Sequence, residues 1–102
     1  MRLPALLSLF TLAASVSAWD VSSYYDEHCN DLEGTKSLED EPLACENFDT
    51  IDPMLSVKAA TNGRTIKFYR GEDCTYSWYG VFAKDGECIS AKGKPWKSYQ
   101  VL

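Results

Sequence analysis

The chain contains a single histidine, His28, and no Cys-x-x-Cys pair. With one histidine, most mechanisms that use a histidine pair, or a nucleophile with a histidine base, are excluded. His28 is also the only imidazole that could help complete a zinc site. We therefore predict no catalytic residue, no metal site and no cofactor, and we interpret His28 as a solvent-facing turn residue beside Cys29.

One enzyme alternative stays open, a small secreted ribonuclease. Glu27 and His28 would act as its acid and base, and Arg64 or Arg70 would hold a phosphate. The guanyl-specific ribonucleases would show a second histidine and a His-x-Tyr-x-Asn segment, and this sequence has neither. We therefore expect that the protein is not an enzyme.

The sequence has no long apolar run except at its amino terminus. Residues 1–18, MRLPALLSLFTLAASVSA, begin with Arg2, continue through an apolar stretch and end in small residues, as a secretory signal peptide does. The run is shorter than the roughly 20 residues of a transmembrane helix. We expect a secreted, extracellular monomer with no membrane span and a single domain over residues 19–102.

Basic residues are scarce in the first half of that domain. Residues 19–57 hold eleven acidic side chains against Lys36 alone, whereas residues 58–102 hold eight basic and four acidic ones. The simplest interpretation is a solvated surface that keeps the protein soluble. Attraction between the halves, or an anionic ligand on the basic half, are the alternatives, and a net-acidic exported chain is not expected to bind nucleic acid.

Four cysteines stand in this short chain: Cys29, Cys45, Cys74 and Cys88. An even number in an exported protein of this size predicts two disulfides. Chains this small bury only about 60–65% of their unfolded surface, so crosslinks are needed to supplement the core.

The chain repeats itself. The segment IKFYRGEDC resembles the earlier DVSSYYDEHC, and the closing segments MLSVKAA and WKSYQVL also correspond; the matched pairs are Val21 with Ile66, Tyr24 with Tyr69, Glu27 with Glu72, Cys29 with Cys74 and Ser56 with Ser98. We assign repeat one to residues 19–60 and repeat two to residues 64–102. Because duplication would carry a self-contained crosslink, we favour pairing Cys29 with Cys45 and Cys74 with Cys88, although four cysteines allow three connectivities and spacing does not choose among them.

Within each copy, apolar residues alternate with polar ones, as in Ile66, Phe68 and again in Tyr99, Val101. This period of two predicts strands with one buried face, and two small units would pack into an antiparallel sandwich. Asn62-Gly63 is the strongest hairpin signal in the chain and should join the last strand of repeat one to the first strand of repeat two. Any helix should be short and should lie in residues 38–49.

Each copy has a strand, a cysteine-containing segment such as FYRGEDC, and a closing segment, SVKA or SYQVL. This succession, present twice, resembles the βγ-crystallin Greek-key family, in particular its small secreted cysteine-containing fungal and bacterial members. The resemblance implies an all-β fold of two Greek-key repeats that form a small antiparallel β-sandwich with two disulfides. The sequence departs from the family pattern after Tyr24 and Tyr69, where the family has a second aromatic residue and then a glycine. Here Cys29 and Cys74 stand at the aromatic position, and both glycines are missing. In the family's calcium loops, only Asp52, Ser56 and Ser98 match ligand positions.

The most aromatic segment contains Tyr76, Trp78, Tyr79 and Phe82, with Trp96 further on. Core packing is the first interpretation of these side chains. The alternative is an exposed platform of Tyr76, Trp78, Tyr79 and Trp96 that binds a carbohydrate or a partner protein.

These observations lead us to expect a small secreted, non-catalytic binding protein. It would be effector-, toxin- or inhibitor-like and would act outside the cell on another organism's molecule. The alternative is a structural or stress-related crystallin-like protein with degenerate calcium sites.

We predict that calcium does not stabilise this protein. Leu55 and Ile51 cannot donate oxygen, and Lys94 and Lys97 place positive charge where a second site should be. Even a site with a millimolar Kd would add about 1.4 kcal/mol at roughly 10 mM calcium. Thermal melts in chelator and in calcium should therefore coincide; a calcium-specific rise in Tm of more than about 4 °C, absent with magnesium, would contradict the loop assignment.

Overall fold

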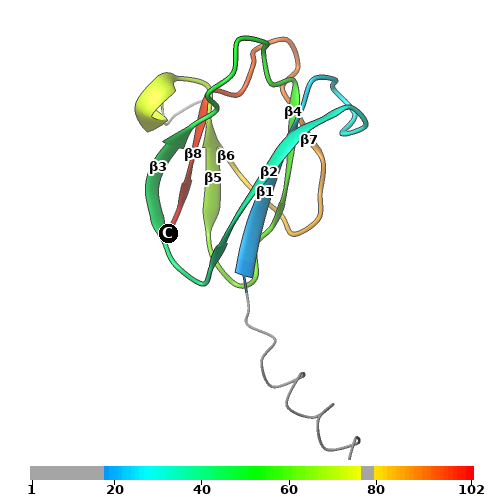
Figure 1. The fold of residues 1–102 in the computed structure, drawn as a ribbon. Coiled ribbons are helices and arrows are strands. Elements are labelled where there is room, and N and C mark those ends of the chain that lie inside the picture. Colours follow the sequence, from blue (N-terminus) through cyan, green and yellow to red (C-terminus); the bar gives the residue numbers. More distant parts are fainter. Residues whose placement is uncertain (1–17, 77–79) are drawn as a thin grey trace, which may run out of the picture.

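Two four-stranded antiparallel sheets pack face to face in the computed structural model, which describes residues 18–76 and 80–102 (Figure 1). The elements in chain order are β1 (Ala18–Tyr24), β2 (Leu32–Glu39), β3 (Leu43–Asn47), β4 (Ser56–Ala60), β5 (Ile66–Tyr69), the 3-10 turn η1 (Glu72–Cys74), β6 (Val81–Phe82), β7 (Ile89–Ser90) and β8 (Ser98–Val101). The predicted all-β sandwich is confirmed.

The two repeats exchange one strand each. The first sheet has the order β2-β1-β4-β7 and the second the order β3-β8-β5-β6. Strand β3 of repeat one therefore lies beside β8 of repeat two, and β7 of repeat two lies beside β4 of repeat one. Neither repeat forms its own sheet, so each sheet is complete only when both copies are folded.

Loop residues 40–42 carry the chain across from β2 to β3, and two side chains hold them. The indole Nε1 of Trp19 donates to the carbonyl of Glu41 at 2.6 Å, and Arg64 pairs with Asp40 at 3.0 Å. The Trp19 ring is fully buried and packs edge-on against Tyr99. The crossover is therefore fastened to the core at its midpoint.

The repeat seen in the sequence is reproduced in the hydrogen bonds. The Ser56 hydroxyl donates to the carbonyl of Asp26 at 2.6 Å and accepts from the Cys29 amide at 3.0 Å. The Ser98 hydroxyl donates to the carbonyl of Gly71 at 2.6 Å and accepts from the Cys74 amide at 2.9 Å. Both serines are fully buried, so each closes the turn of its own repeat by the same pair of bonds.

The turn held by each serine contains a cysteine in the left-handed backbone region. Cys29 has φ of 58° and Cys74 has φ of 57°. A residue with a Cβ atom costs about 1–2 kcal/mol in this conformation. The buried serine bonds and the disulfides hold these two residues there, where a turn of this kind would otherwise favour glycine.

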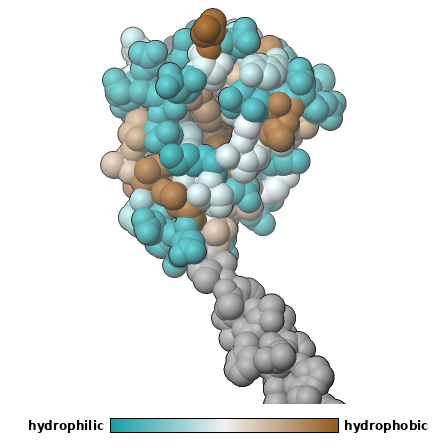
Figure 2. All heavy atoms as spheres, viewed as in Figure 1, coloured by the Kyte–Doolittle hydropathy of each residue, from teal (hydrophilic) through white to brown (hydrophobic). Residues whose placement is uncertain are grey.

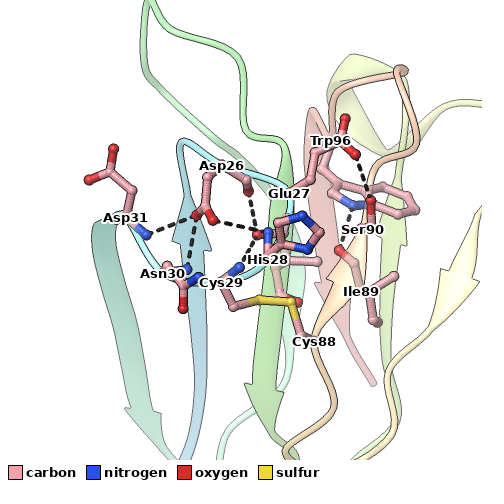
Figure 3. The surroundings of a disulfide bond; sticks show 12 residues. Asp26, Glu27, His28, Cys29, Asn30, Asp31, Cys88, Ile89, Ser90 and Trp96 are labelled. Carbon is pink, nitrogen blue, oxygen red and sulfur yellow. Dashed lines mark hydrogen bonds between the residues drawn. A yellow bond between two sulfur atoms is a disulfide. The ribbon is translucent and has the colours of Figure 1, made fainter.

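The disulfides are Cys29–Cys88 and Cys45–Cys74. Our prediction of pairing within each copy is therefore wrong, because strand exchange carries β3 and β7 away from their own repeats. Cys45 on β3 meets Cys74 of repeat two, and Cys88, just before β7, meets Cys29 of repeat one (Figure 3). The two bridges are images of each other under the repeat. They close loops of 59 and 29 residues, each worth about 4 kcal/mol on the chain-entropy estimate.

Two further predictions need correction. Asn62-Gly63 forms the expected tight turn, with positive φ at both residues and a bond from Arg64 to the carbonyl of Thr61. It does not make a hairpin, because β4 and β5 belong to different sheets and the turn passes between them. The segment 38–49 contains β3 and no helix, since exchange gives it β8 as a pairing partner; the 3-10 turn lies at Glu72–Cys74 instead.

The alternation in Ile66, Phe68, Tyr99 and Val101 marks residues that are buried. The interpretation of the aromatic segment as core is wrong for Tyr76 and Phe82, which are 59% and 56% exposed. The buried residues of the core come from both sheets and from both repeats: Trp19, Val21, Met54, Val57, Ala59, Ile66, Phe68, Ala91, Trp96, Tyr99 and Val101. Met54 and Trp96 occupy equivalent places in the two copies and pair with each other through an isolated bridge. The core is therefore shared, as the exchanged strands require.

We predict that Ser98→Ala and Ser56→Ala each destabilise the protein by about 2 kcal/mol, because each removes a buried hydroxyl and leaves a partly or fully buried N–H and C=O without their partner. The melting temperature should fall by roughly 8–16 °C. Ser22→Ala is the matched control, since its bond to Thr35 is exposed. A loss no larger than that of Ser22→Ala would show that these hydroxyls do not hold the turns.

Candidate functional site

A cleft of about 250 Å³ lies between the two sheets, on the side formed by β1 and β2 of one sheet and β3 and β8 of the other. Figure 2, viewed as in Figure 1, shows a largely hydrophilic surface, with apolar atoms set back in a recess between the sheets. The cleft is lined by Val21, Ser23, Glu33, Gly34, Thr35, Lys36, Glu46, Asn47, Phe48, Asp49 and Tyr99.

The cleft exists because repeat one has small residues where repeat two has large ones. Ser23 on β1 lies opposite Gly34 on β2. The corresponding pair in repeat two is Phe68 opposite Val81. Phe68 is fully buried and Val81 packs against the core, so that pair contributes two apolar side chains to the interior. The Ser23–Gly34 pair contributes one hydroxymethyl group and leaves space.

Gly34 borders open space. A Cβ atom built at this position would meet no other atom within 4 Å, and its backbone is not in the left-handed region. The register places Lys36 opposite the buried Val21, so this lysine follows the core-facing side of β2. A charged residue on the inner side of an edge strand also discourages pairing with another chain.

Tyr99 lines the cleft, and its hydroxyl is buried without a hydrogen-bond partner among the described residues. The side chain is only 2% exposed, and within the described residues its hydroxyl is the buried side-chain polar atom that lacks a hydrogen-bond partner. Burial, and to a lesser degree the negative charge of Glu46, raises the pKa of Tyr99 far above its usual value. The hydroxyl therefore stays protonated. Leaving such a group unpaired costs about 1–3 kcal/mol, so a ligand that moves the rim side chains aside and reaches this hydroxyl would gain a hydrogen bond there.

The rim of the cleft is polar and mostly acidic. Glu33 accepts a hydrogen bond from the buried Ser23 hydroxyl at 2.8 Å. Lys36 on β2 and Glu46 on β3 form an ion pair at 3.5 Å, which joins the two sheets. Both side chains are more than a third exposed, so this pair contributes little to stability and can rearrange when a ligand binds. The Asn47 side-chain amide donates to the Asp73 carboxylate at 3.0 Å and accepts from the Asp73 backbone N–H at 2.8 Å, which ties β3 to η1.

The aromatic residues predicted as a binding platform do not share one exposed surface in the part of the protein described. Trp96 is 1% exposed and belongs to the core, where Arg70 stacks on its ring at 4.1 Å and its Nε1 donates to the carbonyl of Ile89. Tyr76 is 59% exposed. Trp78 and Tyr79 lie outside the described residues. Trp96 is therefore buried and not available to the alternative platform.

His28 is exposed and lies in the turn after β1, as expected (Figure 3). In this turn the Asp26 carboxylate accepts bonds from the amides of Asp31, Asn30 and His28, and these bonds, above all the one from Asp31, lower the pKa of Asp26. The groups considered for a ribonuclease have other partners. Arg64 binds Asp40, Arg70 donates to the carbonyls of Ala91 and Lys94, and Glu27 accepts from Ser90.

Across residues 18–76 and 80–102, no three His, Cys, Asp or Glu side chains form a group that could hold a metal ion. In the same residues there is no helix with the length and apolar character needed to cross a membrane.

The residues that make the cleft were missed because each is ordinary on its own. The signal was present in the repeat: aligning the copies sets Ser23 against Phe68, and a buried aromatic replaced by serine indicates missing volume. Gly34 within an exposed strand was a second signal, because glycine in a strand often marks close approach of a ligand or backbone.

We predict that Tyr99→Phe does not destabilise the protein and stabilises it by up to about 1 kcal/mol, because it removes an unpaired buried hydroxyl. Tyr69→Phe is the matched control. The Tyr69 hydroxyl bonds to Gln100 at 2.8 Å, so its loss should cost about 1 kcal/mol. Urea unfolding of both variants measures the difference, and equal losses would mean that Tyr99 has a partner in solution.

Comparison of the chain with protein-family models, with curated proteins and with solved structures gave no match. The cleft is therefore interpreted from its own geometry.

Proposed function

We propose that this is a secreted binding protein that acts without catalysis and recognises its target through the cleft between the sheets. The observation that carries the proposal is the Tyr99 hydroxyl, which is buried and unpartnered on a residue that lines the polar cleft. Folding alone gives no benefit from such a group, because phenylalanine would pack equally well without the cost of an unpaired hydroxyl. A ligand that bonds to it accounts for its presence.

Secretion is supported by the signal-like residues 1–18 and by the two disulfides, since crosslinks of this kind persist in oxidising compartments. The resemblance of the two sequence repeats to the βγ-crystallin family remains part of this proposal. Among functions of small secreted proteins of this type, we favour an effector, toxin or inhibitor that acts on another organism's molecule.

A structural or stress-related role is the competing proposal. It is favoured by the two symmetric crosslinks, which stabilise a small domain without serving any site. The two proposals differ in what they require of the cleft. A binding protein needs it open, whereas a structural protein gains stability when it is filled.

The test is Gly34→Val, which fills the cleft without backbone strain. Replacing a strand glycine by a β-branched residue should stabilise the protein by about 0.5–1 kcal/mol and raise Tm by roughly 2–8 °C. Ser22→Val, on the neighbouring strand but outside the cleft lining, is the control. Fluorescently labelled wild type and both variants would be titrated onto isolated yeast, bacterial and plant cell walls.

We expect wild type and Ser22→Val to bind one of these materials with equal Kd, and Gly34→Val to bind at least tenfold more weakly although it is more stable. If no material retains the wild type, the structural role is the better proposal. If Gly34→Val binds as well as wild type, the cleft is not the site.

A further inference from the structure

The polar groups of the cleft define which ligand could satisfy them all. Glu33, Glu46 and Asp49 provide carboxylate oxygens that only accept hydrogen bonds, and Lys36 provides an ammonium group that only donates. The Tyr99 hydroxyl is kept protonated and can donate and accept. A fitting ligand must therefore present several donors together with acceptors in a small volume.

Charge removes two classes of ligand. Three carboxylates against one ammonium give the lining a net negative charge, so an anion would be repelled. A hard divalent cation needs six to eight oxygen ligands. The described residues contain no cluster of acidic side chains that could hold one. A simple ammonium group would satisfy the carboxylates but would leave the Tyr99 hydroxyl without an acceptor, whereas Lys36 is already paired with Glu46.

The cleft also has an apolar wall. Val21 is buried at the base, and Phe48 lines the cleft while it packs on Tyr99 at 5.2 Å and stacks on Phe68 at 6.5 Å. The ring of Phe48 is thus held rigidly by two other aromatics. A flat array of C–H groups fits an aromatic wall of this kind, whereas a fully polar ligand would desolvate it without gain.

The volume limits the size. About 250 Å³ lies just under the roughly 300–1,000 Å³ of sites for drug-sized ligands, which leaves room for one or two sugar rings and no more.

We propose that this cleft binds a neutral sugar of one or two rings, with ligand hydroxyl groups donating to Glu33, Glu46 or Asp49, one hydroxyl paired with Tyr99, and the C–H face of the ring against Phe48. This inference rests on the proposed function and specifies its ligand. The sugar hydroxyl is suited to the site because one group both donates to a carboxylate and accepts from the tyrosine.

The experiment titrates the isotopically labelled full domain with sugars and follows backbone amide shifts by NMR. The neutral probes are glucose, galactose, mannose and N-acetylglucosamine. Glucosamine and glucuronate carry a positive and a negative charge on the same kind of ring, and putrescine tests a bare ammonium ligand. We expect at least one neutral sugar to saturate with a Kd of about 0.1–10 mM, with shifts at Gly34, Asn47, Phe48 and Tyr99, and glucuronate to produce none.

Two variants test the contacts. Tyr99→Phe should weaken binding of that neutral sugar at least tenfold, whereas Tyr69→Phe should leave it unchanged. Gly34→Val should abolish the shifts while the protein stays folded, as its Tm and the rest of its spectrum would report. Equal affinity of Tyr99→Phe and wild type would overturn the role of the hydroxyl and with it the inference.

The inference is also overturned if no neutral sugar shifts these amides, if shifts map away from the cleft, or if only glucosamine and putrescine bind. These results are distinguishable from failure of the proposed function. Binding to cell walls that depends on Gly34 would survive a negative result with every soluble sugar, and it would then indicate a protein or cationic target at the same cleft.

Discussion

The exchange of β3 and β7 between the two sheets is the constraint on which the rest of this structure depends. Each exchanged strand is held by pairing to the other repeat and by a disulfide to that repeat's turn. The turn itself is closed by a buried serine of its own repeat, through Ser56 or Ser98. Cys29 and Cys74 therefore each take part in two kinds of contact, a hydrogen bond to the serine of their own repeat and a disulfide to the other repeat. Neither half can reach its native form alone, because its sheet lacks a strand and its cysteine lacks a partner.

The same exchange places the cleft. Because β3 crosses to the second sheet directly after β2, these consecutive strands lie at the edges of two different sheets and face each other across the opening. The ion pair between Lys36 and Glu46 spans them. Repeat symmetry alone would predict an equally filled interior on both sides. The substitution of Ser23 and Gly34 for Phe68 and Val81 breaks that symmetry and leaves space for the cleft.

The physical character of the cleft is a compromise between stability and access. A valine at position 34 would improve strand propensity, and a phenylalanine at position 99 would remove an unpaired hydroxyl. Retaining glycine and tyrosine sacrifices stability in a small domain that has little to spare. The two disulfides close loops longer than pairing within each repeat would give, and this added restriction of the unfolded chain offsets that loss.

The all-β fold class was predicted correctly from the sequence, but the cleft was not. Alternation in Ile66, Phe68, Tyr99 and Val101 identified buried faces because a strand presents every second residue to the same side. For Trp96 the sequence left core and binding platform both open, because alternation indicates that a face is buried but not which aromatic side chain the other sheet will cover; the structure places it in the core. The positive-φ turn at Asn62-Gly63 was recognisable, yet its strands part to different sheets, since a turn's local geometry does not specify long-range pairing.

The amino-acid sequence by itself determined the repeat, the strands and the four cysteines that would be oxidised, because these follow from local periodicity, turn chemistry and composition. Only the tertiary structure decided which cysteines meet. Three connectivities are compatible with the same spacing, and the choice depends on the exchange of β3 and β7 across the sandwich. It likewise decided the cleft, since the space beside Ser23 and Gly34 and the unpaired hydroxyl of Tyr99 arise only when strands distant in sequence pack against one another.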